Sequence, residues 1–369
     1  MAKWVAGRQL TDELAAPATL STPIALTRLG QIAMMATDLA WIGHIGTEAL
    51  AAAALAGMIL SVGVTFAAGV ISAVGPLAAK HVARRTELWY GARCAWGYGV
   101  AIVLWAPIMV LPLQGEQIVL ALGYEPAIAR QAQQYLFGLA SGILPALWFL
   151  AIRSFMAAVN CPTPALWITL AAIPTNALLA YLLITGQFGL PQLDLFGAGL
   201  ATSLVNGATF LAGIWFVTQC RPFRDYQVLR YLWRFDWPSM RQLIVIGTPV
   251  SVAIFMESGL FSATALLMGV ISTTAVAAYQ IAFQVATALF MIPFCIGMAV
   301  SVRVGHALGR NDLSSIRRVG AAAMLLLLPI STGVIEEEID DDRQEIPLMP
   351  LERSRSLASA RRRADAAGS

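Results

Sequence analysis

Long apolar runs alternate with short polar connections along most of the chain. Eight runs have about 20 residues or more, the length that an α-helix needs to cross the hydrocarbon core of a bilayer. A ninth run, Val319 to Val334, is apolar but short for a span. The pattern therefore predicts an all-α polytopic membrane protein. The eight runs are approximately Leu20 to Ile42, Leu50 to Ala79, Cys94 to Leu113, Gln133 to Ala157, Ala165 to Thr185, Phe196 to Thr218, Leu243 to Met268 and Ala275 to Val302.

Composition supports this prediction and excludes several classes of protein. Of 369 residues, 58% are hydrophobic and 12% are charged, whereas about a quarter are charged in an ordinary soluble domain. The four cysteines are far apart, so neither a disulfide framework nor a metal site is expected. The chain lacks the Gly-x-Ser-x-Gly and His-Glu-x-x-His motifs, and its three histidines lie at or beyond the ends of the runs. We therefore expect that the protein is not an enzyme and does not bind nucleic acid.

The positive charges predict the orientation, because Lys and Arg near span ends mark cytoplasmic loops. They gather after the second, fourth, sixth and eighth runs, while the intervening loops together contain only Arg130. The segment before the first run carries Lys3 and Arg8. The N-terminus is therefore expected in the cytoplasm.

Two acidic residues lie within the eight long runs, at a depth where a carboxylate that faces lipid would cost several kcal/mol. Glu257 lies near the middle of the seventh run, and Asp38 lies about four residues from the outer end of the first. We expect both to face the inside of a bundle or a wet cavity and to bind a cation or a substrate. For Asp38 the alternative is a carboxylate that is wetted from outside or that caps a neighbouring backbone.

The chain also contains a weak internal repeat at an offset of 226 residues, which aligns Pro23 with Pro249. Six runs separate the two starts, so the halves have the same orientation, as in a parallel repeat of a transporter. Glu257 then falls opposite Gln31, which makes Gln31 a candidate. Thr264, seven residues after Glu257, shares its helix face and adds a hydroxyl. Both prolines are expected to kink their helices.

Milder polar residues complete the set of candidates. Asn176, mid-run and just after a proline, either lines a cavity or makes an inter-helix hydrogen bond. Tyr279, Gln280 and Gln284 form a polar stripe on the eighth run, and the stripe either lines a lumen or joins helices.

Four segments resemble the multidrug and toxic compound extrusion (MATE) transporters. They are Thr22 to Leu55 (TPIALTRLGQIAMMATDLAWIGHIGTEALAAAAL), Phe149 to Thr169 (FLAIRSFMAAVNCPTPALWIT), Gly197 to Gly207 (GAGLATSLVNG) and Ala275 to Asp312 (AVAAYQIAFQVATALFMIPFCIGMAVSVRVGHALGRND). The resemblance covers about Leu14 to Val334. It implies two six-helix bundles around a central cavity, with Asp38 and Glu257 at positions associated with cation coupling or substrate binding and Asn176 at a polar position that lines the cavity in the fifth span.

From the resemblance we expect a MATE-like two-bundle fold with a complete N-terminal bundle and an incomplete C-terminal one. The expected parts are a cytoplasmic N-terminus (1–19), the N-terminal six-helix bundle (20–218), a cytoplasmic linker (219–242), a partial C-terminal bundle (243–334) and a charged, disordered tail (335–369). The abrupt end of the ninth run suggests a truncated or frame-shifted chain.

The function implied by the resemblance is antiport of small organic cations or drugs against Na⁺ or H⁺ in the bacterial cytoplasmic (inner) membrane. The only expected cofactor is the coupling ion, with Na⁺ held at Glu257 or Asp38; membrane lipids are the other partners, and the protein is expected to be a monomer. Two alternatives remain at this stage: an inactive fragment of such a transporter, and a flippase for lipid-linked substrates.

Overall fold

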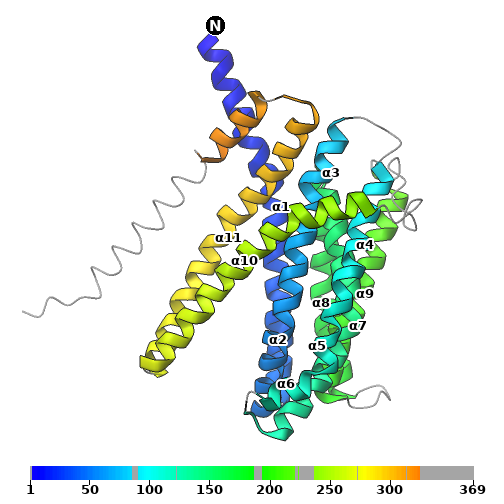
Figure 1. The fold of residues 1–369 in the computed structure, drawn as a ribbon, viewed down its shortest axis with the longest axis vertical. Coiled ribbons are helices and arrows are strands. Elements are labelled where there is room, and N and C mark those ends of the chain that lie inside the picture. The colour runs from blue at the N-terminus through cyan, green and yellow to red at the C-terminus, as the bar shows by residue number, and fades with distance from the viewer. Residues whose placement is uncertain are drawn as a thin grey trace, which may run out of the picture. The chain divides into compact units, whose positions relative to one another are not determined.

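The computed structural model describes residues 2–84, 90–121, 123–186, 193–220, 223, 237–271, 273–312 and 314–324. These residues are almost entirely helical (Figure 1) and contain no strand. The helices are α1 (Ala2–Ile45), α2 (Thr47–Ser72), α3 (Val74–Ala83), α4 (Tyr90–Ile108), α5 (Val110–Leu113), α6 (Gly115–Ala121), α7 (Pro126–Ala158), α8 (Thr163–Thr185), α9 (Asp194–Gln219), α10 (Trp237–Ile271) and α11 (Thr273–Gly309). Residues 314–324 are also helical, whereas the expected tail, 335–369, lies outside the described residues.

The apolar runs and the helices agree closely. Among the described residues, six helices are long and apolar enough to cross a membrane, or seven if Gly97–Leu113 and Gly115–Ala121, which are bent by 59°, form one span. The first expected span, inside α1, is not among them. It carries Arg28 and Asp38, whose polarity lowers the hydropathy of the segment. Its charged side chains contact other helices: Asp38 accepts a hydrogen bond from Thr202 of α9, and Arg28 lies over the Phe294 ring of α11.

Small residues hold the N-terminal bundle together. A Cβ added to Gly142 of α7 would come 2.5 Å from the Cα of Ser203 on α9, and one added to Gly197 of α9 would come 2.7 Å from the Leu183 carbonyl oxygen of α8. The Ser203 hydroxyl also donates a hydrogen bond to the Gly138 carbonyl of α7 at 2.6 Å. Such close backbone approach is what drives helix association where water supplies no hydrophobic force.

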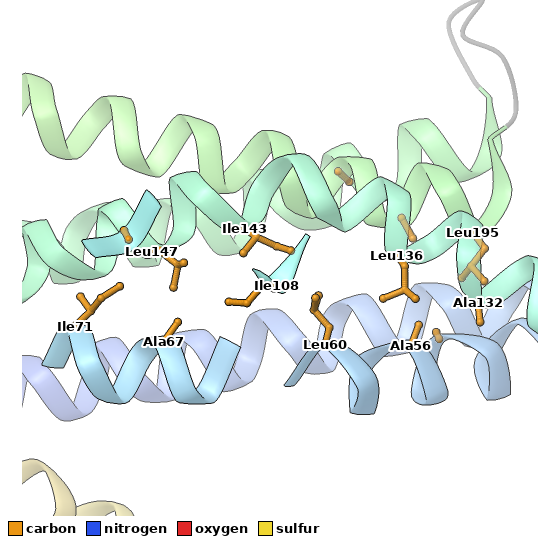
Figure 2. Packing of buried hydrophobic residues seen from close by; sticks show 14 of the residues in the cluster. Ala56, Leu60, Ala67, Ile71, Ile108, Ala132, Leu136, Ile143, Leu147 and Leu195 are labelled. Atoms are coloured by element: carbon orange, nitrogen blue, oxygen red, sulfur yellow. The ribbon is translucent and has the colours of Figure 1, made fainter. Parts of the chain in front are cut away.

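Larger apolar side chains fill the space between α2 and α7. Figure 2 shows Leu60 and Ile71 of α2 facing Leu136 and Leu147 of α7, with Ile108 of α4 between them. All five are buried. This core fixes α7 at the centre of the bundle, in contact with α2, α8 and α9.

The helices α10 and α11 pack on α2 and α3. Gly247 of α10 lies directly against the backbone of Val70, and the Ser251 hydroxyl donates to the Phe66 carbonyl of α2 at 2.8 Å. Gly305 of α11 lies against the Pro76 carbonyl of α3. These contacts involve the end of α2 and α3 that precedes Arg84, the last described residue before the basic loop. We call this end of the helices the basic end.

The helix limits repeat at the offset seen in the sequence. α1 ends at Ile45 and α10 at Ile271, 226 residues later, while α2 begins at Thr47 and α11 at Thr273, at the same spacing. Both repeat-related prolines lie inside continuous helices, Pro23 in α1 and Pro249 in α10. Kinking at these prolines stays a prediction.

Candidate functional site

A polar cluster inside the N-terminal bundle surrounds the carboxylate of Asp38. One carboxylate oxygen, Oδ1, accepts a hydrogen bond from Nδ2 of Asn176 on α8. The other, Oδ2, accepts one from the Thr202 hydroxyl of α9 at 3.1 Å. Three helices that are far apart in sequence thus converge on one acid.

Each partner is held in place by its own helix. Asn176 has no exposed surface and lies two residues after Pro174, inside α8. Thr202 lies in the small-residue stretch of α9, where Ala198 and Ala201 are buried. The Thr202 oxygen also lies 3.2 Å from the Ala198 carbonyl oxygen, so its single proton has two acceptors within reach.

The cluster contains one polar atom without a partner. The amide oxygen of Asn176, Oδ1, is buried and accepts no hydrogen bond from any described group. A buried acceptor of this kind costs free energy unless a donor, water or an ion satisfies it. Together with the carboxylate of Asp38 and the hydroxyl of Thr202, it provides the oxygen ligands that hard cations prefer.

Tyr135 of α7 is a further member, because its phenol lies within electrostatic range of Asp38. Neither Tyr135 nor Thr202 is a candidate in the sequence analysis. Thr202 follows the Gly-Ala-Gly-Leu-Ala motif, which the sequence assigns only to helix packing. The signal that would find it is its spacing from Ala198, which places both on one face of α9.

Glu257, the other embedded acid, has a different environment. Its side chain is exposed on α10, and among the described residues it makes no hydrogen bond or ion pair. The apolar side chains beside it on the helix, Met256 and Leu260, are also exposed, by 68% and 66%. The hydroxyl of Thr264 donates to the Leu260 carbonyl of its own helix at 2.9 Å. The role of Glu257 therefore stays a prediction.

The expected polar stripe on α11 is described only in part. The Tyr279 hydroxyl donates to the Phe261 carbonyl of α10 at 3.1 Å, and its ring stacks on Phe283 at a centroid distance of 5.9 Å. Tyr279 thus joins α10 to α11. The side chains of Gln280 and Gln284 lie outside the described part of the structure.

Gln31 lies in a separate cluster. Its side-chain oxygen accepts a hydrogen bond from Arg153 of α7 at 2.9 Å. Gln31 and Asp38 are seven residues apart on α1, yet their side-chain hydrogen bonds go to different helices. The internal repeat pairs Gln31 with Glu257, and no described contact tests the predicted role of Gln31.

Comparison with known proteins gives consistent matches. The family model described as MatE matches residues 23–182 and 249–335. A "Probable multidrug resistance protein NorM" of Bradyrhizobium diazoefficiens is 54% identical over 317 residues, which are 86% of this chain and 68% of that protein. A protein of the same name from Rhodopseudomonas palustris is 50% identical over 305 residues, 83% of this chain and 64% of its own. The chain thus spans about two thirds of the length of these relatives.

Solved structures agree on the fold. The eukaryotic MATE transporter AtDTX14 superposes with a TM-score of 0.76 at 18% identity, over 93% of this chain and 76% of that one. The Vibrio cholerae MATE transporter VcmN in the bent form gives 0.76 at 18% identity, over 87% and 72%.

Proposed function

Because this chain belongs to the MatE family, whose members are efflux transporters and not enzymes, we propose that it exports small organic cations in exchange for Na⁺ or H⁺. The relatives named multidrug resistance protein support the substrate class. The positive charges near the span ends support a multi-pass protein of the bacterial inner membrane with its N-terminus in the cytoplasm. We further propose that it works as a monomer.

The coupling cation binds, in this proposal, at the carboxylate of Asp38. The observation that carries it is the buried, unpartnered amide oxygen of Asn176 beside that carboxylate. A sodium ion would take Asn176 Oδ1, the carboxylate and the Thr202 oxygen as ligands. A proton would instead sit on the carboxylate, and the resulting O–H would donate to Asn176 Oδ1. Either ion satisfies the orphaned oxygen.

Transport then follows from alternating access, in which the cation favours one arrangement of the two halves and the substrate favours the other. The close contacts that Gly247, Ser251 and Gly305 make with α2 and α3 lie towards the basic end, which the charge pattern assigns to the cytoplasm. This arrangement supports a state that is closed on the cytoplasmic side. Glu257, exposed on α10, is our candidate for a second cation or substrate group.

The test is efflux of a fluorescent organic cation from proteoliposomes that contain the 369-residue chain, with sodium and proton gradients imposed separately. We expect one of the two gradients to drive efflux. Asp38→Asn should abolish ion-driven efflux, because the amide that replaces the carboxylate carries no charge to hold a cation. Asn176→Leu removes the orphaned oxygen and should weaken the dependence on the ion. Glu116→Gln is the matched control, since Glu116 lies 3.8 Å from Arg130 in a partly exposed ion pair.

Undiminished efflux by Asp38→Asn would refute the coupling site. Absence of ion-driven efflux from inserted wild-type protein would refute transport by this chain and leave its family membership intact.

A further inference from the structure

Two arginines lie inside the bundle and converge on one neutral side chain. Arg153 of α7 donates from Nη1 to the side-chain oxygen of Gln31 at 2.9 Å, and Arg28 of α1 donates to the same oxygen at 3.4 Å. A guanidinium remains charged in proteins. Two positive charges are therefore held close together by an amide that carries none.

No described carboxylate balances these charges. Arginine–acid ion pairs lie elsewhere in the described part of the chain, as between Arg130 and Glu116 and between Arg318 and Asp312. The Nε atom of Arg28 is buried and has no hydrogen-bond partner in the described part of the chain. A buried charge without a counter-charge destabilises the fold, so the pair of arginines calls for an anion.

A pocket lies beside the two guanidinium groups. It is lined by residues of α1, α7, α11 and the start of α8: Ile24, Thr27, Arg28, Arg153, Ser154, Ala157, Pro162, Ala165 and Met298. The hydroxyls of Thr27 and Ser154 donate to carbonyls of their own helices, at 2.6 and 2.9 Å. The arginines are therefore the donors that remain for a ligand, and most of the remaining lining is apolar.

The pocket also lies near the ends of its helices. α7 ends at Ala158 and α8 begins at Thr163, and both Ala157 and Pro162 line the pocket. Lipid headgroups lie at the level where membrane helices end, and basic pockets between such helices bind them. A fork of two guanidinium groups matches the geometry of a phosphate.

We propose that this pocket binds the phosphate of an anionic phospholipid, with the apolar lining against the glycerol and the upper acyl chains. The ligand would connect the two halves of the chain, because Arg28 also lies over the Phe294 ring of α11 at 5.8 Å. A phosphodiester in the pocket would offset one of the two positive charges and strengthen the contact of α11 with the N-terminal bundle. Inorganic phosphate has the same charged group as the phospholipid but lacks its apolar part.

The test is native mass spectrometry of the full chain in a neutral detergent, titrated with phosphatidylglycerol, phosphatidylcholine or inorganic phosphate. We expect wild-type protein to retain phosphatidylglycerol, and Arg28→Gln combined with Arg153→Gln to weaken that binding about tenfold or more, since charge-assisted hydrogen bonds are lost. Arg130→Gln, on the same helix as Arg153 but in an exposed ion pair, should bind as wild type.

A second variant guards against misfolding of the first. Arg28→Lys combined with Arg153→Lys keeps both positive charges but removes the forked donors of the guanidinium groups. We therefore expect this variant to bind phosphatidylglycerol several-fold more weakly than the wild type. Binding of phosphatidylglycerol that is unchanged in the variants would overturn the proposal. Equal binding of phosphatidylcholine, or complete displacement of the lipid by an equal concentration of inorganic phosphate, would also overturn it.

Discussion

The contact between α2 and α10 provides a sharp test of the packing argument through the substitution Gly247→Ala. A Cβ at this position would lie 2.6 Å from both the Cα and the carbonyl oxygen of Val70, whereas ordinary contacts begin at 3.4 Å. The obstructing atoms are backbone and cannot rotate away. The two helices must therefore separate by about 0.8 Å, a gap that forfeits a quarter to a half of the dispersion energy of neighbouring contacts.

The expected cost follows from these magnitudes. Overpacking of this kind costs about 1–3 kcal/mol, and alanine returns up to about 1 kcal/mol through its higher helix propensity. The control is Gly259→Ala on the same helix, where an added Cβ would meet nothing within 4 Å and only the propensity gain applies. We expect the two variants to differ by about 2 kcal/mol, or roughly 2–3 °C in thermal midpoint for a chain of this length.

The assay is thermal unfolding of both variants in the same detergent, combined with distance measurements between spin labels at Arg84 and Gln242, both of which are exposed. Gly247→Ala should unfold at the lower temperature and should lengthen or broaden the distance distribution. An unfolding temperature for Gly247→Ala that equals or exceeds that of Gly259→Ala would show that the Val70 backbone does not obstruct a side chain at position 247.

Two further predictions concern other helix pairs. Gly142→Ala should destabilise the contact between α7 and α9 by about 1–3 kcal/mol, because the added Cβ would lie 2.5 Å from Ser203 Cα; Gly207→Ala, with open space around it, is the control in the same unfolding assay. Tyr279→Phe keeps the ring stack and loses the hydrogen bond to Phe261, so faster hydrogen exchange across α10 and α11 and a loss of about 0.5–1.5 kcal/mol are expected; unchanged exchange would contradict this.

Much of the fold could be predicted from the sequence, because the bilayer requires long apolar helices and the chain marks them clearly. The helix limits of α8 and α9 differ from the expected runs by about two residues. Helix α10 begins at Trp237, inside the segment 219–242 for which a cytoplasmic linker is expected, and the linker itself stays a prediction. There the boundary was drawn from hydropathy alone, whereas a helix continues past the apolar region as long as its backbone hydrogen bonds continue.

The candidate site could be predicted from the sequence only in part. Asp38 and Asn176 are both identified from the cost of burying a polar group, yet nothing in a separation of 138 residues indicates that they form a hydrogen bond. Thr202 was missed because a hydroxyl is cheap to bury on a helix. The contact between Gln31 and Arg153 could not be predicted either. Periodicity defines one face of a helix, but the helix that packs on this face depends on how the helices are rotated about their axes.

The two acceptors of the Thr202 hydroxyl have a consequence for how the site responds to a cation. The oxygen lies 3.1 Å from Asp38 Oδ2 and 3.2 Å from the Ala198 carbonyl oxygen, and it has one proton to give. When the proton points to Asp38, the hydroxyl serves the empty carboxylate as a donor. When it turns to Ala198, the lone pairs of the same oxygen face the carboxylate side and can receive a positive charge. The side chain thus exchanges one role for the other by a rotation about a single C–O bond, and α9 need not move to admit the ion.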